Sequence, residues 1–298
     1  MTGALTLLAL VAFASNSILC RLALAPHEID PANFTLTRLG SGGLTLLIIH
    51  AIVTRSWTGG TEAQRAANAR PTGHALIAAV LLFLYALPFS LAYVSISAGT
   101  GALILFTAVQ ATMLLGALRS GERFRPLEGV GLVIAIAGLV YLVKPGLSAP
   151  SPVGSALMAV AGIAWGLYSL RGRGSRDPLR DTTNNFVLTI PFAVAARWAP
   201  AAIAAPLGFA HSPASTRGLI LAAASGALAS GLGYTVWFAA LRGLTAIRAS
   251  MVQLAVPVIT AVGGIIFLHE AITTRLLVSA ALILGGLGIA LAGRTRSS

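Results

Sequence analysis

Long apolar runs recur along the whole chain, each bounded by arginines or by clusters of proline, glycine and serine. A helix of about 20 apolar residues can cross the hydrocarbon core of a bilayer. Only 55–74 forms a long polar connection, and the short connections elsewhere are typical of antiparallel neighbours in a helical bundle. The pattern predicts an all-α polytopic membrane protein with ten transmembrane helices. The predicted spans are 3–24, 32–54, 75–95, 100–118, 127–144, 153–170, 182–200, 217–240, 249–268 and 276–293.

Composition excludes several other classes of protein. Of the 298 residues, 56% are hydrophobic and only 9% are charged, whereas soluble domains carry about 25% charged residues. The single cysteine, Cys20, and five scattered histidines cannot supply a disulfide framework or a structural zinc site, so we expect no metal and no cofactor. No segment is long enough for a basic solvated domain, so the net charge of +12 does not indicate a nucleic-acid partner.

The basic residues are distributed unevenly between the two sides of the predicted bundle. Ten spans place both termini on the same side. Fourteen of the 20 basic residues fall in segments on that side, four fall on the other side, and Arg21 and Arg38 lie within spans. Cytoplasmic segments of membrane proteins are enriched in Lys and Arg. The distribution therefore predicts that both termini are cytoplasmic, and it accounts for most of the positive charge.

The two halves of the chain are weakly similar to each other. Shifting the sequence by 148 residues aligns Glu122 with Glu270, and each ends an apolar span and begins a short turn. The order of elements is also shared. We expect two five-helix repeats, 1–150 and 151–298, with opposite orientations because each has an odd number of spans. In transporters built from inverted repeats, the substrate site lies near the middle of the membrane between the repeats.

Several short segments resemble a known family of transporters. They are Phe13-Ala14-Ser15-Asn16 followed by Arg21-Leu22, then Trp165-Gly166, and the stretch from Ala240-Leu241 through Met251 and Pro257 to Glu270. Over nearly its whole length the chain resembles EamA-type proteins of the drug/metabolite transporter superfamily, and among them the YddG-type exporters of aromatic and other amino acids. The resemblance implies ten helices in two five-helix units, cytoplasmic termini and export across the bacterial inner membrane. One departure is that Val109 stands where the repeat would place a partner for Pro257, so helix-break arguments apply only to the second half.

Polar side chains inside the predicted spans are candidates for substrate binding, because a polar group in lipid needs a cavity or a partner. Asn16, Gln110 and Gln253 are such residues, and Gln110 and Gln253 lie in spans that the repeat makes counterparts. Each amide could hold an amino or carboxyl group without a fixed charge. The alternative is a hydrogen bond between helices, which contributes about 0.6 kcal/mol on average in membranes.

Aromatic side chains form the second set of candidates. Residues three or four apart share one face of a helix. This spacing pairs rings within three of the spans: Tyr85 with Phe89, Trp165 with Tyr168, and Tyr234 with Trp237. A cavity lined by such rings would accept aromatic or aliphatic side chains. The alternative is a belt of rings at the membrane surface, which suits Trp57 and Trp198 better because they lie near span ends. The resemblance to amino-acid exporters points to Tyr85 and Trp165 in particular.

Prolines and charges inside the spans suggest how the protein moves and what drives it. Pro257 lies four residues from Gln253, and we expect it to act as a hinge. Arg21 and Arg38 could attract a carboxylate, although snorkelling or pairing with the backbone is the commoner fate of such arginines. No acidic residue lies in the middle of a predicted span, so direct proton exchange on a carboxylate is disfavoured and export down a substrate gradient is favoured.

These patterns together predict a transporter and not an enzyme. The expected function is export of amino acids, aromatic and other neutral ones, or of similar small metabolites by alternating access through a cavity near the membrane midplane. Exporters of drugs, nucleosides or sugars, and lipid flippases or receptors on the same fold, remain alternatives. A membrane-embedded enzyme is disfavoured because the sequence contains no H-E-x-x-H and no G-x-S-x-G motif. The expected partners are a small-molecule substrate and the lipid bilayer, and the expected state is a monomer or a weak homodimer.

Overall fold

The chain folds into a bundle of helices. A computed structural model describes residues 2–55, 73–119, 126–144, 149–172, 177–198, 214–241 and 252–295, and the single residues 146, 175, 243 and 244. These residues form ten helical segments and no strand, which confirms the predicted all-α polytopic fold.

The helices of the first half of the chain are α1 (Thr2–Leu24), α2 (Pro31–Arg55), α4 (Gly73–Ala92), α5 (Ala98–Arg119) and α6 (Pro126–Val143). Those of the second half are α7 (Pro152–Gly172), α8 (Pro178–Arg197), α10 (Thr216–Ala224), α11 (Gly233–Leu241), α13 (Ala255–Leu268) and α14 (Thr274–Thr295). A π-helix, η2 (Ser225–Leu232), joins α10 to α11, so that these three elements form one continuous segment.

The ends of three helices differ from the predicted spans by three residues or more. α4 ends at Ala92 and not at 95, and α8 begins at Pro178 and not at 182. α13 begins at Ala255, after a turn at Leu254, whereas the sequence placed the start of this span at 249. Residues 245–251 are outside the part of the chain that the structure describes.

The outer surface of the bundle carries large apolar side chains. Leu8 (60% exposed), Ile52 (64%), Val133 (66%) and Phe267 (62%) are examples from four different helices. Within the described ranges, five helical segments are long and apolar enough to cross a membrane, and four shorter apolar helices accompany them. Apolar side chains on the outside of long apolar helices are what a bilayer requires. The chain is therefore a multi-pass membrane protein.

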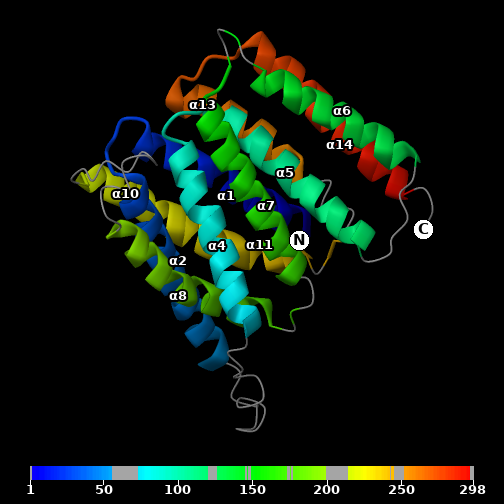
Figure 1. Cartoon of the computed structure of the whole chain (residues 1–298). Helices are drawn as coiled ribbons and strands as arrows, with labels where there is room; N and C mark the ends of the chain where they lie inside the picture. The colour runs from blue at the N-terminus through cyan, green and yellow to red at the C-terminus, as the bar shows by residue number, and fades with distance from the viewer. Residues whose placement is uncertain are drawn as a thin grey trace.

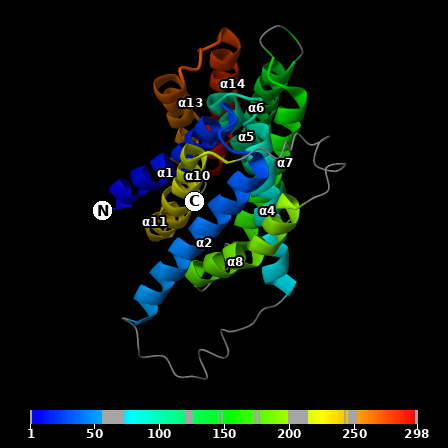
Figure 2. The same cartoon turned by 90° about the vertical axis from the view of Figure 1, so that its left-hand side faces the viewer.

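The helices are arranged as a compact group and a separate pair. Figures 1 and 2 show α1, α2, α4, α5, α7, α8, α10, α11 and α13 gathered together, and in Figure 1 α6 and α14 lie side by side along one edge. Glycines allow the pair to approach closely: a Cβ added to Gly131 would lie 2.4 Å from the carbonyl oxygen of Gly286. A Cβ added to Gly162 on α7 would likewise lie 2.5 Å from the carbonyl oxygen of Leu105 on α5. Small residues of this kind are the usual contacts between membrane helices.

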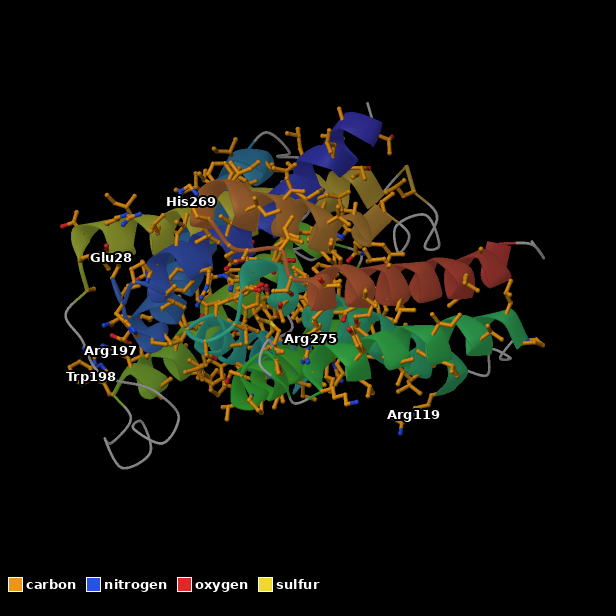
Figure 3. The ribbon with its side chains drawn as sticks, turned by 90° about the horizontal axis from the view of Figure 1, so that it is seen from above. Glu28, Arg119, Arg197, Trp198, His269 and Arg275 are labelled. Atoms are coloured by element: carbon orange, nitrogen blue, oxygen red, sulfur yellow. The ribbon has the colours of Figure 1, made fainter. Side chains whose placement is uncertain are left out.

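The two ends of the bundle can be told apart by their charged residues. The turns α1–α2, α4–α5 and α13–α14 meet at one end, which we call the Glu270 end because Glu270 contacts residues of the other two turns or their helices. Figure 3 shows Glu28 and Arg197 on one side of the molecule. Arg119, the last residue of α5, lies far from them on the other side.

Candidate functional site

A small cavity lies where helices of the two halves of the chain meet. Its walls come from α1, α4, α5, α7 and α11. The lining residues are Phe13, Asn16, Ser17, Tyr85, Phe89, Leu105, Phe106, Trp165 and Tyr234. Its volume is about 20 Å³, which is enough for about one water molecule. A substrate larger than water can therefore enter only if these side chains move apart.

Aromatic rings form a continuous series around this cavity. The ring centroids of Tyr85 and Trp165 are 4.8 Å apart, and those of Trp165 and Tyr234 are 5.3 Å apart. Phe89 continues the series beyond Tyr85 at 5.4 Å, and Phe13 beyond Tyr234 at 6.0 Å. All four distances lie in the range at which aromatic pairs attract each other. The series joins α4 of the first half to α7 and α11 of the second.

Asn16 places a fixed amide in the cavity wall. Its Nδ2 donates a hydrogen bond to the Tyr85 hydroxyl at 3.3 Å, and its Oδ1 accepts one from Ser225 Oγ at 2.5 Å. Ser225 is the first residue of η2 and is fully buried. Asn16 therefore links α1 to α4 and to the π-helix, and both ends of its amide are oriented.

Arg38 on α2 extends this polar network away from the cavity. Its Nη2 donates to the Tyr85 hydroxyl at 3.0 Å and its Nε to Ser230 Oγ at 3.4 Å, while Ser230 Oγ donates to the carbonyl of Ser225 at 3.0 Å. We call the five residues Asn16, Arg38, Tyr85, Ser225 and Ser230 the Arg38 cluster. Arg38 is only 2% exposed, so it does not snorkel to the membrane surface as membrane arginines commonly do.

The π-helix brings its two serines to this cluster by lying against the backbone of α2. A Cβ added to Gly226 would lie 2.1 Å from the carbonyl oxygen of Arg38, and one added to Gly231 would lie 3.0 Å from Cβ of Thr45. In a π-helix the hydrogen bonds join residues five apart, and π-helical turns are frequent at functional sites. The Ser-Gly pair at 225–226 recurs at 230–231, which is the same spacing of five. This repeat was the signal in the sequence that could have indicated the element.

A second group of charged residues closes the Glu270 end. Arg21 Nη1 donates to the carbonyls of Tyr93 (2.7 Å) and Val94 (2.9 Å), and Arg21 Nε lies 3.4 Å from Glu270 Oε1. Both carboxylate oxygens of Glu270 accept from the backbone N–H of Ala98, the first residue of α5. A carboxylate at a helix N-terminus is stabilised by the free N–H groups there. The group therefore ties α1, the α4–α5 turn and the α13–α14 turn together.

A larger hollow adjoins this group on the Glu270 end. Its volume is about 280 Å³, and its wall is rich in polar and charged side chains. They include Arg21, Glu270 and Arg275, with Ser97 and Thr100 from the start of the α5 region. The Arg21–Glu270 pair and the α4–α5 turn form part of the wall of this hollow, and neither Arg21 nor Glu270 lines the aromatic cavity.

The structure brings together most of the candidates that the sequence suggested. Asn16, Tyr85, Phe89, Trp165 and Tyr234 all line the cavity. Two further candidates, Tyr168 and Trp237, each contact a ring that lines the cavity. Tyr168 stacks on Trp165 at 5.5 Å and accepts a hydrogen bond from Asn185 at 3.2 Å, and Trp237 contacts Phe13 at 5.7 Å. Whether these residues bind substrate stays a prediction.

The remaining candidates lie elsewhere. Gln110 is buried in α5 but does not line the cavity, and its Nε2 makes no hydrogen bond to the described residues. Gln253 is half-buried just before α13 and also lies outside the cavity wall. Pro257 is in the first turn of α13, which begins after a turn at Leu254, and a proline there interrupts fewer hydrogen bonds than one in a helix interior. Its role as a hinge stays a prediction.

The sequence did not identify several residues of the site. Phe13, Ser17, Leu105 and Phe106 line the cavity, and Ser225 and Ser230 hold the Arg38 cluster together. Arg21 pairs with backbone carbonyls, as the commoner fate of a membrane arginine implied, and with Glu270.

Comparisons with other proteins agree with this architecture. The EamA-like transporter family matches the chain twice, over residues 1–144 and 152–292. An uncharacterized protein of Pseudomonas aeruginosa is 44% identical over 290 residues, which cover 97% of this chain and 94% of that protein. An uncharacterized transporter of Archaeoglobus fulgidus is 29% identical over 204 residues, covering 67% of this chain and 70% of the relative.

One crystal structure is similar over 98% of both chains, with a TM-score of 0.62 and 21% sequence identity, and this likeness concerns the fold alone. The family match covers nearly the whole chain, and one of the relatives is described as a transporter. The chain belongs to the EamA-like transporter family and is a multi-pass membrane transporter of the drug/metabolite type.

Proposed function

We propose that this protein exports amino acids, aromatic and other neutral ones, or similar small metabolites. The observation that carries the proposal is the series of aromatic rings around a cavity between the two halves of the chain. Rings in such a wall favour a substrate with an apolar or aromatic side chain, and the amide of Asn16 offers donors and an acceptor to its polar end. The resemblance to YddG-type exporters of aromatic and other amino acids points in the same direction.

The mechanism proposed is alternating access, in which the two five-helix halves, 1–150 and 151–298, rock against each other. The cavity of about 20 Å³ and the group formed by Arg21, Glu270 and the α4–α5 turn correspond to a state closed at the Glu270 end. In the orientation proposed, this end faces away from the cytoplasm, both termini are cytoplasmic, and the membrane is the bacterial inner membrane. Opening would then require separation of Arg21 from Glu270.

The proposed energy source is the substrate gradient. Among the described residues no carboxylate lines the aromatic cavity, and Glu270 is engaged by Arg21 and Ala98 at the end of the bundle. A carboxylate in the binding site is the usual means of exchanging a proton for a substrate. Counterflow should therefore continue without a pH gradient.

The test is counterflow of labelled phenylalanine and leucine in liposomes that contain the purified protein. Trp165→Ala should lower the initial rate by about tenfold or more, because a buried aromatic side chain at the centre of a binding site is a typical hot spot. Trp198→Ala is the matched control, because Trp198 is 76% exposed at the end of α8, and its rate should stay close to that of the wild type. Equal rates in the wild type and Trp165→Ala would contradict the proposed site, and no counterflow of any amino acid would contradict the proposed substrate class.

A further inference from the structure

Arg38 is a buried cation that forms no ion pair with any acidic residue in the described part of the chain. It lies seven residues inside α2, or about 10 Å from the first residue along the helix axis, and it is 2% exposed. Arginine keeps its proton in proteins, so the charge remains when the side chain is buried. Within the described residues the ion pairs are Arg21–Glu270 and Arg217–Glu28, and neither involves Arg38.

The hydrogen bonds of Arg38 are also incomplete. A guanidinium has five N–H donors. Two hydroxyl groups, of Tyr85 and Ser230, receive one bond each, and Nη1 is buried without a partner among the described residues. The rings of Tyr85 and Phe89, with centroids 5.2 and 5.0 Å from Arg38 Cζ, stabilise the charge through cation–π contacts. They do not accept the remaining N–H groups, and an unpaired buried charge is strongly unfavourable.

The position of Arg38 relates it to the cavity. Arg38 does not line the cavity as it stands, but it packs over Tyr85 and Phe89, which do. The Tyr85 hydroxyl also accepts from Asn16, another lining residue. Because a cavity of about 20 Å³ must widen before a metabolite can enter, its wall has to move, and since Arg38 packs over Tyr85 and Phe89, movement of either ring would expose the guanidinium to the cavity.

We propose that Arg38 binds the carboxylate of the transported molecule, an inference that rests on the transport function proposed above and specifies its substrate class. The planar guanidinium fork matches a carboxylate, which can accept two parallel hydrogen bonds. The aromatic rings then surround the apolar body of the substrate. The substrate class is an organic carboxylate with a small aromatic or aliphatic body. Amino acids and simple monocarboxylates share this chemistry.

The experiment measures the binding of matched ligands to the purified full-length protein by thermal unfolding. The ligands are 3-phenylpropionate, its neutral amide and phenylalanine, and sodium sulfate serves as an inorganic anion. In the wild type, 3-phenylpropionate should bind about 10- to 100-fold more tightly than the amide, as expected for hydrogen bonds to a charged group. In Arg38→Gln this ratio of affinities should fall to near one, because the variant loses the charge that binds the carboxylate, whereas the neutral amide does not depend on that charge. A merely structural role of Arg38 would weaken both ligands alike.

Further variants keep the result interpretable. Arg38→Lys retains the charge without the fork and should keep a reduced preference for the carboxylate, and it provides the measurement if Arg38→Gln does not fold. Arg217→Gln removes a guanidinium that is 61% exposed and should leave the ratio unchanged. Phenylalanine and 3-phenylpropionate should both depend on Arg38, and the tighter of the two identifies the source of the carboxylate.

Three results would overturn the inference. They are an unchanged ratio in Arg38→Gln, equal binding of 3-phenylpropionate and its amide to the wild type, and sulfate stabilising the protein as well as 3-phenylpropionate does. Counterflow of amino acids in the same preparation separates this inference from the proposed function. Carboxylate selectivity that depends on Arg38, found without amino-acid counterflow, would support carboxylate binding by Arg38 and contradict amino-acid export. Amino-acid counterflow without that selectivity would support amino-acid export and contradict carboxylate binding by Arg38.

Discussion

Arg21 and Arg38 both lie inside apolar helices of the first half of the chain, yet their surroundings differ. Arg21 is three residues from the end of α1, its side chain is 20% exposed, and it is paired with Glu270 and two backbone carbonyls. Arg38 lies deeper and is 2% exposed, and among the described residues its guanidinium bonds to two hydroxyl groups and packs over two aromatic rings.

The groups that surround each arginine indicate whether its buried charge stabilises the fold or binds a ligand. A guanidinium whose N–H groups meet a carboxylate and carbonyls can hold helices together, because the protein supplies the groups that replace water. A deeper guanidinium without such groups is stabilised fully only when an anion arrives. Arg21 therefore belongs to the closure of the Glu270 end, and Arg38 to the recognition of the substrate.

The largest effect on transport is expected when Arg38 is given a carboxylate partner within the protein, as Arg21 has in Glu270. In Ser230→Asp a carboxylate replaces the hydroxyl that now lies 3.4 Å from Arg38 Nε. This internal carboxylate competes with that of the substrate at a high effective concentration, so the rate of counterflow should fall by about 100-fold while the protein stays folded. Thermal unfolding and liposome counterflow measure the two quantities. Ser230→Asn has the same size without the charge, and equal loss of transport in both variants would show that size alone is the cause.

A smaller effect, on the opening of the Glu270 end, is expected when Arg21 loses its carboxylate partner. Glu270→Gln weakens charged hydrogen bonds that contribute about 1.5–3 kcal/mol, so opening of the Glu270 end should become at least about tenfold more frequent. Cys20, next to Arg21, is the only cysteine of the chain and is 0% exposed, so its rate of alkylation by a maleimide reports this opening. Cys20→Ser should show no labelling. An unchanged rate in Glu270→Gln would mean that the Arg21–Glu270 pair does not close this end.

The smallest effect is expected at a third arginine, on the surface. Arg217 lies 3.3 Å from Glu28, but its side chain is 61% exposed. Exposed ion pairs contribute about 0.2–1 kcal/mol, so Arg217→Gln should change the free energy of unfolding by less than about 1 kcal/mol and counterflow by less than twofold. The measurements are unfolding at low and high salt and liposome counterflow. A loss of unfolding free energy of about 1.5 kcal/mol or more, as large as the contribution of a charged hydrogen bond, would show that burial does not decide the importance of these pairs.

The helices could be predicted from hydrophobicity, and their ends only in part. The start of α8 has a local signal that an apolar count misses: Asp177 accepts from the N–H of Arg180 and is followed by Pro178, so the helix begins in a polar segment. The end of α4 has no such signal. The carbonyls of Tyr93 and Val94 bond to Arg21, which lies about seventy residues earlier in the chain.

The pairing of rings within one helix could be predicted from the sequence because it depends on spacing within that helix. Tyr85 and Phe89 share a face of α4, and their rings are 5.4 Å apart. The Arg38 cluster depends instead on a contact between α2 and η2, whose residues Arg38 and Ser230 are 192 positions apart. The packing of those two elements cannot be read from the sequence. The sequence alone therefore could not show whether Arg38 bonds to serine hydroxyls or to backbone carbonyls.

The contact between Gly131 and Gly286 has a consequence for how the sequence can vary. The space that a Cβ of Gly131 would occupy holds the carbonyl oxygen of Gly286, and a Cβ of Gly286 would in turn lie 2.5 Å from the carbonyl oxygen of Gly131. Both residues already have the smallest side chain, so a change at one cannot be compensated by a change at the other. In a saturation library selected for insertion and folding, these two positions should remain glycine, while lipid-facing neighbours such as Val133 and Ile289 exchange freely among apolar residues.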